Sequence, residues 1–177
     1  APKLDSTITV LDVGGGFSGS ARYLAHHYGC HITVLNLSER ENERGRRMNR
    51  EQGVDHLIDV VDGNFENIPF PDETFDIVWS QDAILHSGNR EQVVKEVARV
   101  LKENGDLIFT DPMMSDDCPE GVLDPILARI KLATLGSPAF YREAAKKYGL
   151  EEKSFEELSD HLTRHYARVL EETEKNE

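Results

Sequence analysis

The stretch of sequence that decides the fold is Ile8-Thr9-Val10-Leu11-Asp12-Val13-Gly14-Gly15-Gly16-Phe17-Ser18-Gly19. Its first half is a short apolar run, which predicts a buried strand over residues 8–13. Its second half has the spacing G-x-G-x-x-G, and residues 20–28 have the periodicity of a helix. Because glycine lets a backbone turn tightly and approach a ligand closely, a strand, this loop and a helix together predict a nucleotide site. The loop alone fits a dinucleotide as well as other nucleotide cofactors.

Strands and helices alternate after the loop. The apolar patterns predict further strands over residues 31–35, 57–61, 75–79 and 107–110, and helices over residues 38–52 and 90–101. Ser38 can cap the first of these helices with Glu41 as its capping-box partner, and we expect Asn104-Gly105 to turn the chain into the last strand. This alternation predicts an α/β fold with a mostly parallel sheet and helices on both faces.

The pattern changes after Asp111. Helical patterns occupy residues 122–135, 138–147 and 162–174. Pro125 suits a first helical turn, Ser137 suits a cap, and we expect Phe155 on a sixth strand. Ligands in open α/β folds bind at the carboxyl end of the strands. We therefore expect one domain with two parts: a cofactor-binding core over residues 1–111, and a helical lid with the C-terminal part over residues 112–177.

The composition of the chain excludes several classes of binding partner. The chain has 177 residues and a net charge of −13, which disfavours nucleic acid and anionic membranes. We expect no membrane span, because no apolar run is long enough, and no secretory signal, because no signal-peptide pattern opens the sequence. Cys30 and Cys118 form no disulfide framework, so we expect a reducing cytoplasm, and no Cys or His spacing predicts a metal site. The excess of acidic residues fits a salty cytoplasm or ordinary solubility equally well.

Polar residues at three strand ends separate the possible cofactors. Asp12 precedes Gly14 by two residues, where its carboxylate would repel a pyrophosphate and attract the ammonium group of S-adenosylmethionine. Asn36 ends the second strand, where an NAD site prefers an acidic residue for the ribose. The run Asp62-Gly63-Asn64-Phe65 follows the third strand, where an adenine would lie. Each could be an ordinary turn residue, but together they favour S-adenosylmethionine over a dinucleotide.

Several motifs carry a resemblance to a known family. Residues 10–16 resemble motif I of the class I S-adenosylmethionine-dependent methyltransferases, and Phe75-Asp76-Ile77-Val78-Trp79-Ser80 resembles their strand-four motif. Residues 98–105 are similar to their R-V-L-K-P-G-G approach to strand five, with Glu103-Asn104 in place of Pro-Gly. More narrowly, residues 35–38 together with 42–44, and residues 79–87, 110–113 and 125–130, resemble sarcosine/dimethylglycine N-methyltransferases. The run W-S-Q-D-A-x-L-H is the most specific part.

The resemblance implies a Rossmann-like class I methyltransferase sheet and an enzyme that methylates sarcosine and/or dimethylglycine to give glycine betaine. Such a role implies osmoprotection in a halophile. Phosphoethanolamine and related small-amine methyltransferases share part of the W-S-Q-D-A-x-L-H pattern and stay as rivals. The family has seven strands, the last antiparallel, with a helical segment before the first strand and a further strand after the last helix. Neither segment has a counterpart in this sequence, so we expect a shortened sheet.

The resemblance also implies roles for individual residues. The methionine part of S-adenosylmethionine would lie at Asp12 and the glycine loop; the full set of implied cofactor residues is Asp12, Gly14, Gly15, Gly16, Gly19, Asn36, Leu37, Asn64, Phe65, Ser80 and Gln81. Of these, Asn36 and Leu37 would face the ribose and adenine, Asn64 and Phe65 the adenine, and Ser80 and Gln81 the sulfonium.

Candidate catalytic residues follow from the chemistry of methyl transfer, which needs a deprotonated amine and a well-placed cofactor. His86 can help to deprotonate the amine, Gln81 can bond a carboxylate, and Asp111 can face the developing ammonium. His86 is also a candidate for substrate binding, and Arg129 or Arg142 can bind the carboxylate of the substrate. The alternatives are a structural histidine, a turn carboxylate before Pro112 and surface-paired arginines. Met113 and Tyr141 suit core packing better than a wall around a methylammonium group.

Other functional classes fit less well. A core that binds the cofactor without turning it over stays open, because the family's front segment has no counterpart here. Asp12 and Asn36 count against a nucleotide-dependent oxidoreductase, and the charge and the lack of an N-P-P-[YF] motif count against a nucleic-acid methyltransferase. The sequence makes no prediction of oligomeric state.

Overall fold

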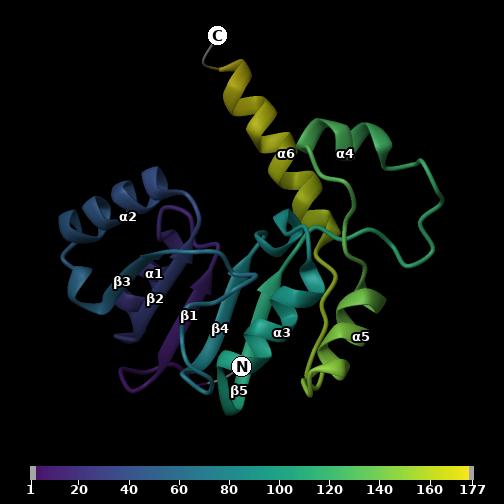
Figure 1. Ribbon diagram of the computed structural model, residues 1–177. Coiled ribbons are helices and arrows are strands. Elements are labelled where there is room, and N and C mark those ends of the chain that lie inside the picture. The colour runs from purple at the N-terminus through teal and green to yellow at the C-terminus, as the bar shows by residue number, and fades with distance from the viewer. Residues whose placement is uncertain (1–2, 176–177) are drawn as a thin grey trace.

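A five-stranded parallel sheet forms the centre of the structure, a computed structural model that describes residues 3–175 (Figure 1). The strands are β1 (Thr9–Val13), β2 (His31–Asn36), β3 (Ile58–Asp62), β4 (Phe75–Gln81) and β5 (Leu101–Thr110). Their spatial order is β3-β2-β1-β4-β5, and every neighbouring pair is parallel. The order reverses direction between β1 and β4, which is the switch point at which such sheets bind ligands. The expected parallel, Rossmann-like sheet is confirmed.

The helices lie between and after the strands. They are α1 (Gly19–Tyr28), α2 (Glu39–Glu51), α3 (Arg90–Val100), α4 (Asp124–Ile130), α5 (Pro138–Lys147) and α6 (Ser159–Glu174), with short 3₁₀ turns η1 (Asp55–Leu57) and η2 (Ile84–His86). The Ser38 hydroxyl accepts a hydrogen bond from the backbone N–H of Glu41 at 3.4 Å, so the predicted Ser38 cap of α2 is confirmed. The Glu41 carboxylate accepts from the Asn36 side-chain amide at 3.1 Å. Ser137 caps α5 in the same way by accepting from the N–H of Phe140.

Helices cover both faces of the sheet, as the alternation of side chains along each strand requires. Leu11 and Val13 of β1 pack on one face against α3 and α5, whereas Val10 packs on the other face against α1. The first face also takes Tyr141 from α5, which is buried in the same cluster. The sheet therefore has a core on each side, and its loops are left to build a site at the strand ends.

The strand β5 differs from its prediction. It begins at Leu101 rather than at residue 107, because Leu101 already pairs with Phe75 and the register then shifts so that Asp106 pairs with Ile77. Asn104 takes up the shift with a φ of 64°, a left-handed conformation that Asn tolerates. Asn104-Gly105 is therefore an irregularity inside a paired strand and not a turn in front of it.

The region after Asp111 also corrects two expectations. The helix expected over residues 122–135 is only α4, because Lys131 adopts a φ of 58° and ends it. Phe155 lies on no strand: residues 151–158 carry no regular structure, and its ring is half exposed beneath the Arg142 guanidinium, 4.8 Å from the ring centroid. The expected helices α5 and α6 are confirmed, although no residue of α6 is buried.

Figure 1 shows α6 extending past the end of the sheet toward which the strands run, with α4 beside it. Its stripe of apolar side chains, Leu162, Tyr166, Val169 and Leu170, is exposed. Within residues 3–175, no helix is long and apolar enough to cross a membrane.

Candidate functional site

The carboxyl ends of the strands bring the predicted cofactor residues to one edge of the sheet. The N–H of Gly14, directly after β1, donates to the carbonyl of Leu35 at 2.8 Å, and the N–H of Gly63 donates to the carbonyl of Asn36 at 3.2 Å. A side chain at Gly14 would also meet Ala83 and the ring of Phe65. The segments that follow β1, β2, β3 and β4 therefore converge on the glycine loop.

The glycine loop (residues 14–19) needs its glycines for two different reasons. Gly14 has a φ of 74°, and a Cβ on it would lie 2.4 Å from the Cβ of Ala83. Gly16 has a φ of 51°, but no atom of residues 3–175 lies within 4 Å of a Cβ built there or on Gly19. Gly14 thus packs the loop against the segment after β4, while Gly16 and Gly19 leave bare backbone that a ligand can approach.

Asp12 lies beneath this loop. Its side chain is 1% exposed and accepts a hydrogen bond from the Ser20 hydroxyl at 2.6 Å. A Cβ on Gly15 would come within 2.7 Å of the Asp12 carboxylate, so the carboxylate faces the loop backbone. Burial raises the pKa of Asp12 to about 6, and the Ser20 hydroxyl opposes that rise. At neutral pH the loop therefore has a negative charge directly under it.

A network of amides joins the ends of β2 and β3. The Asn36 side-chain amide donates to the Asn42 side-chain oxygen at 3.1 Å, and the Asn42 amide donates to the Asn36 carbonyl at 2.9 Å. Asn42 also donates to the Asp62 carboxylate at 2.6 Å, and Arg46 donates to its other oxygen at 2.9 Å. The Asn42 and Arg46 hydrogen bonds hold the pKa of Asp62 below its usual range.

Neither Asn42 nor Arg46 is among the cofactor residues that the sequence predicts. Their spacing of four residues on a predicted helix places them on the same face, which was the available signal. Their importance depends on β3 lying beside that face, which no local pattern reveals. Leu37, next to Asn36, is 73% exposed and presents an apolar surface at this edge.

The other predicted cofactor residues have distinct surroundings. Asn64 accepts from the N–H of Glu66 at 2.9 Å and is exposed, while Phe65 packs partly against the core. Ser80 is buried and donates its hydroxyl to the Val13 carbonyl at 3.2 Å, which ties β4 to β1. Gln81, the last residue of β4, is exposed.

Two of the three candidate catalytic residues, His86 and Asp111, meet at η2. His86 is its last residue and is exposed, and the N–H of Leu85 just before it donates to Asp111 at 3.1 Å. The other Asp111 oxygen accepts from the Tyr141 hydroxyl at 2.5 Å. Burial raises the pKa of Asp111 to about 6, opposed by the hydrogen bonds from Tyr141 and Leu85. Burial and the neighbouring Asp111 also raise the pKa of Tyr141.

The two arginines proposed for the substrate carboxylate lie on different helices. Arg129 is exposed on α4. Arg142 is exposed on α5, where its guanidinium pairs with Glu152 at 2.7 Å. A substrate carboxylate at Arg142 would have to compete with Glu152.

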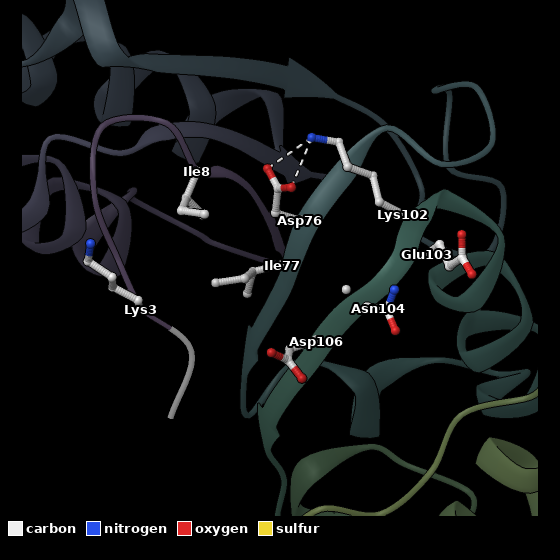
Figure 2. Close-up of a pocket in the computed structure, with 9 residues that line it drawn as sticks. Lys3, Ile8, Asp76, Ile77, Lys102, Glu103, Asn104 and Asp106 are labelled. Atoms are coloured by element: carbon white, nitrogen blue, oxygen red, sulfur yellow. Dashed lines mark hydrogen bonds and ion pairs between the residues drawn. The ribbon is translucent and has the colours of Figure 1, made fainter.

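A cavity of about 270 Å³ lies at the opposite end of the sheet (Figure 2). It is lined by residues at the beginnings of β4 and β5, among them Asp76 and Lys102, whose ion pair measures 3.0 Å. Thr9 supports that pair by donating its hydroxyl to Asp76 at 2.7 Å. Because ligands of these folds bind at the carboxyl ends of the strands, this cavity is separate from the glycine-loop site. Within the described residues, no group of three or more His, Cys, Asp and Glu side chains is placed to hold a metal ion.

Comparisons with known proteins agree with this geometry. Residues 11–109 match the family described as a methyltransferase domain. The chain is 60% identical over 168 residues to the sarcosine/dimethylglycine N-methyltransferase of Halorhodospira halochloris, a match that covers 95% of this chain and 60% of that relative. A solved structure from Galdieria sulphuraria, provisionally described as a sarcosine dimethylglycine methyltransferase, superposes with a TM-score of 0.94 at 39% identity and covers 97% of this chain and 64% of that one.

A geranyl diphosphate methyltransferase solved in complex with SAM shares the fold, with a TM-score of 0.79 at 22% identity over 85% of this chain and 61% of that one. The chain thus spans about 60% of the length of the curated relative it matches. The predicted class I methyltransferase fold and the predicted resemblance are confirmed. Because the family match over residues 11–109 takes in more than half of the sequence, the chain belongs to the methyltransferase domain family.

Proposed function

We propose that this chain is the catalytic part of an S-adenosylmethionine-dependent N-methyltransferase. Its substrate is a small amine, sarcosine and/or dimethylglycine, and its final product is glycine betaine. The observation that carries the proposal is the open glycine loop over a buried carboxylate, at the edge where the segments after four strands converge. The relative that is 60% identical is named as a sarcosine/dimethylglycine N-methyltransferase, which supports the choice of substrate.

The residues of this edge fit S-adenosylmethionine. A negative charge at Asp12 under the loop opposes a pyrophosphate and suits a cationic ligand. The bare backbone at Gly16 and Gly19 admits a ligand, and the exposed Leu37 offers apolar contact to an adenine. The proposed contacts are Asp12, Gly14, Gly15, Gly16 and Gly19 for the methionine part, Asn36 and Leu37 for the ribose and adenine, Asn64 and Phe65 for the adenine, and Ser80 and Gln81 for the sulfonium.

The bound cofactor supplies a methyl group on a sulfonium, and the protein's own residues prepare the amine that receives it. We assign to His86 the removal of the ammonium proton, because it is exposed on η2 beside the loop after β4. The Gln81 amide donates to a carboxylate of the substrate or cofactor. Asp111 faces the positive charge that develops on nitrogen, and its burial strengthens that interaction. Arg129 or Arg142 holds the substrate carboxylate.

The proposal is tested first by calorimetry with S-adenosylhomocysteine on the folded chain. Saturable binding is expected, and the absence of binding would reject the cofactor assignment. The second step measures transfer of a labelled methyl group to sarcosine, dimethylglycine and phosphoethanolamine in parallel. Transfer to the first two supports the proposal, whereas transfer to phosphoethanolamine alone would replace the substrate. Binding without transfer to any of them would identify a cofactor-binding core that does not turn over.

A pair of histidine variants tests the role of His86. We expect His86→Gln to lower kcat about a hundredfold at pH 7, because a general base contributes on that order. The loss should shrink at high pH, where the amine deprotonates without help. His56→Gln is the matched control, because His56 is also exposed but lies on η1 before β3. An unchanged kcat in His86→Gln would remove His86 from the mechanism.

A further inference from the structure

The peptide groups on both sides of Leu85 are held by charged side chains. The N–H of Leu85 donates to Asp111 at 3.1 Å, and its carbonyl accepts from the Arg90 guanidinium at 2.7 Å. Asp111 comes from the end of β5 and Arg90 from the first turn of α3, so two different elements hold one residue. The second of these peptide groups leads directly into His86. Asp111 and Arg90 therefore hold the backbone of η2 next to His86.

Both holding residues are in turn anchored by the segment that follows α4. Tyr141 of α5 donates its hydroxyl to Asp111 at 2.5 Å, and its ring packs edge-on against Phe109 and Phe140 at centroid distances of 5.0 and 5.3 Å. Arg90 donates to the Thr134 hydroxyl at 2.9 Å and also to the Thr134 carbonyl. Residues 134–141 are thus linked to η2 by two chains of hydrogen bonds, one through Asp111 and one through Arg90.

We propose that Tyr141 and Arg90 are positioning residues for methyl transfer, which hold His86 in place by acting through Asp111 and through the Leu85 carbonyl. This inference rests on the proposed function, because it takes His86 as the group that prepares the amine. Neither residue touches the reacting atoms. Their effect is to fix the backbone of η2, and a small misplacement of a catalytic group is costly to the rate of a reaction that depends on orientation.

The surroundings of Asp111 give the proposal a pH signature. The titratable and charged groups that face it are Tyr141 from α5, Arg90 from α3 and Asp82 from the loop after β4. The Tyr141 hydroxyl donates to the carboxylate and stabilises its ionised form, so removing that hydroxyl raises the pKa of Asp111 further. Protonated Asp111 is a weaker acceptor for the N–H of Leu85. When the solution is acidified, a protein without the Tyr141 hydroxyl should therefore lose the hydrogen bond between the Leu85 N–H and Asp111 at a higher pH than the wild type does.

The first test compares two tyrosines at α5. Tyr141→Phe keeps the ring and removes the hydroxyl at Asp111, whereas Tyr148→Phe removes a hydroxyl that donates to Glu91 of α3 at 2.9 Å, away from η2. In the methyl-transfer assay we expect Tyr141→Phe to lower kcat about tenfold, to leave the KM for S-adenosylmethionine unchanged and to move the acid limb of the kcat profile to higher pH. Tyr148→Phe should match the wild type. Identical kcat and pH profiles in the two variants would overturn the proposal for Tyr141.

Arg90 is tested by Arg90→Lys, which keeps the charge but loses the fork that reaches Leu85 and Thr134 together. We expect a kcat loss of similar size with the KM for S-adenosylmethionine unchanged. Arg47→Lys is the control, because Arg47 is exposed and pairs only loosely with Glu51 at 3.7 Å. An Arg90→Lys protein with the kcat of the Arg47→Lys control would overturn the proposal for Arg90.

A second readout does not depend on activity. In protein labelled with ¹⁵N-leucine, the amide signal of Leu85 should titrate with Asp111, with a midpoint near pH 6. The midpoint should rise in Tyr141→Phe and stay in place in Tyr148→Phe. If the wild type binds S-adenosylhomocysteine but transfers no methyl group, the proposed function fails while this titration still tests the hold on η2. If the Leu85 amide signal does not move between pH 4 and pH 8 in the wild type or in either tyrosine variant, the inference itself would be overturned.

Discussion

Asn42, which is fully buried in α2, donates its side-chain amide to the Asp62 carboxylate at the end of β3 over 2.6 Å. The same amide group donates to the Asn36 carbonyl at the end of β2. One side chain on a helix therefore fixes the spacing of two strand ends at the proposed ribose and adenine site.

Replacing Asn42 by Asp tests this link. Asn42→Asp would set a second carboxylate against Asp62 and remove both donated hydrogen bonds, so we expect a loss of about 2–4 kcal/mol in the free energy of unfolding at pH 7. The loss should shrink toward pH 4, where the introduced carboxylate can be protonated. Urea unfolding measures it, with Asn67→Asp as the control at an exposed position. Equal losses in the two variants would contradict the assignment.

The glycine loop gives a prediction about cofactor binding. Gly14→Ala would place a Cβ 2.4 Å from Ala83 and strain a φ of 74°, so it should disturb the loop backbone. We expect the Kd for S-adenosylhomocysteine to rise at least tenfold, which is about 1.4 kcal/mol. Gly53→Ala is the matched control, because Gly53 has a φ of 68° but no atom of the described residues lies within 4 Å of a Cβ built on it. Calorimetry with S-adenosylhomocysteine on both variants separates the effect of contact with Ala83 from the effect of backbone strain. Equal Kd values for Gly14→Ala and Gly53→Ala would contradict the prediction.

The buried Asp12 predicts a particular pH dependence of stability. Its pKa in the folded protein is about 6, above the ordinary value of 3.8, so the folded state holds an extra proton between those values. The free energy of unfolding therefore falls as pH rises from about 4 to about 6, and the cost is fully present at pH 7. Asp12→Asn removes this titration. Relative to the wild type, the variant should gain on the order of 2–3 kcal/mol between pH 4 and pH 7.

Unfolding curves of both proteins at the two pH values measure that difference. Asp111 has a similarly raised pKa but is present in both proteins, so its contribution cancels. A difference between the two proteins that is the same at pH 4 and pH 7 would show that Asp12 titrates normally.

Replacing Arg99 should lower the free energy of unfolding without changing the proposed activity. Its guanidinium donates to Glu96, to Asp72 and to the carbonyls of Ile68 and Phe70, and so joins α3 to the loop before β4. Arg99→Lys cannot reach all four acceptors, and we expect a loss of about 1–3 kcal/mol in the free energy of unfolding. Arg47→Lys should change it by less than about 0.5 kcal/mol, because Arg47 makes only a surface pair. A thermal or urea melt that shows no difference between them would refute the role of Arg99.

The sequence was sufficient for the elements whose signals are local. The apolar run before Gly14 predicted β1, and Ser38 and Ser137 predicted the starts of α2 and α5, because caps and buried strands depend on nearby residues. The turn expected at Asn104-Gly105 is wrong, because the same residue types suit an irregularity in a strand and only the partner strand decides between the two. The strand expected at Phe155 is wrong, because residues 151–158 carry no regular structure.

The site also has one part that local sequence signals predict and another part that they do not. The glycine loop and the residues at the strand ends follow from motif spacing. The hydrogen bonds that hold Leu85 do not, because Asp111 follows β5, Tyr141 lies on α5 and Arg90 lies on α3, and they meet only in the folded chain. For Asp12, the sequence shows only that a carboxylate stands two residues before the glycine loop. Its position beneath Gly15, facing the backbone, is a fact of packing.

The strand order has a consequence for how the chain folds. The central strand β1 pairs on one side with β2, a near neighbour, but on its other side with β4, so that Val13 and Ser80, 67 residues apart, share a hydrogen bond. Closing so long a loop costs chain entropy before any contact repays it, which slows folding. During synthesis, one edge of β1 must stay unpaired until β4 has left the ribosome. The stretch most important for the site is therefore also the stretch exposed longest to mispairing with another chain.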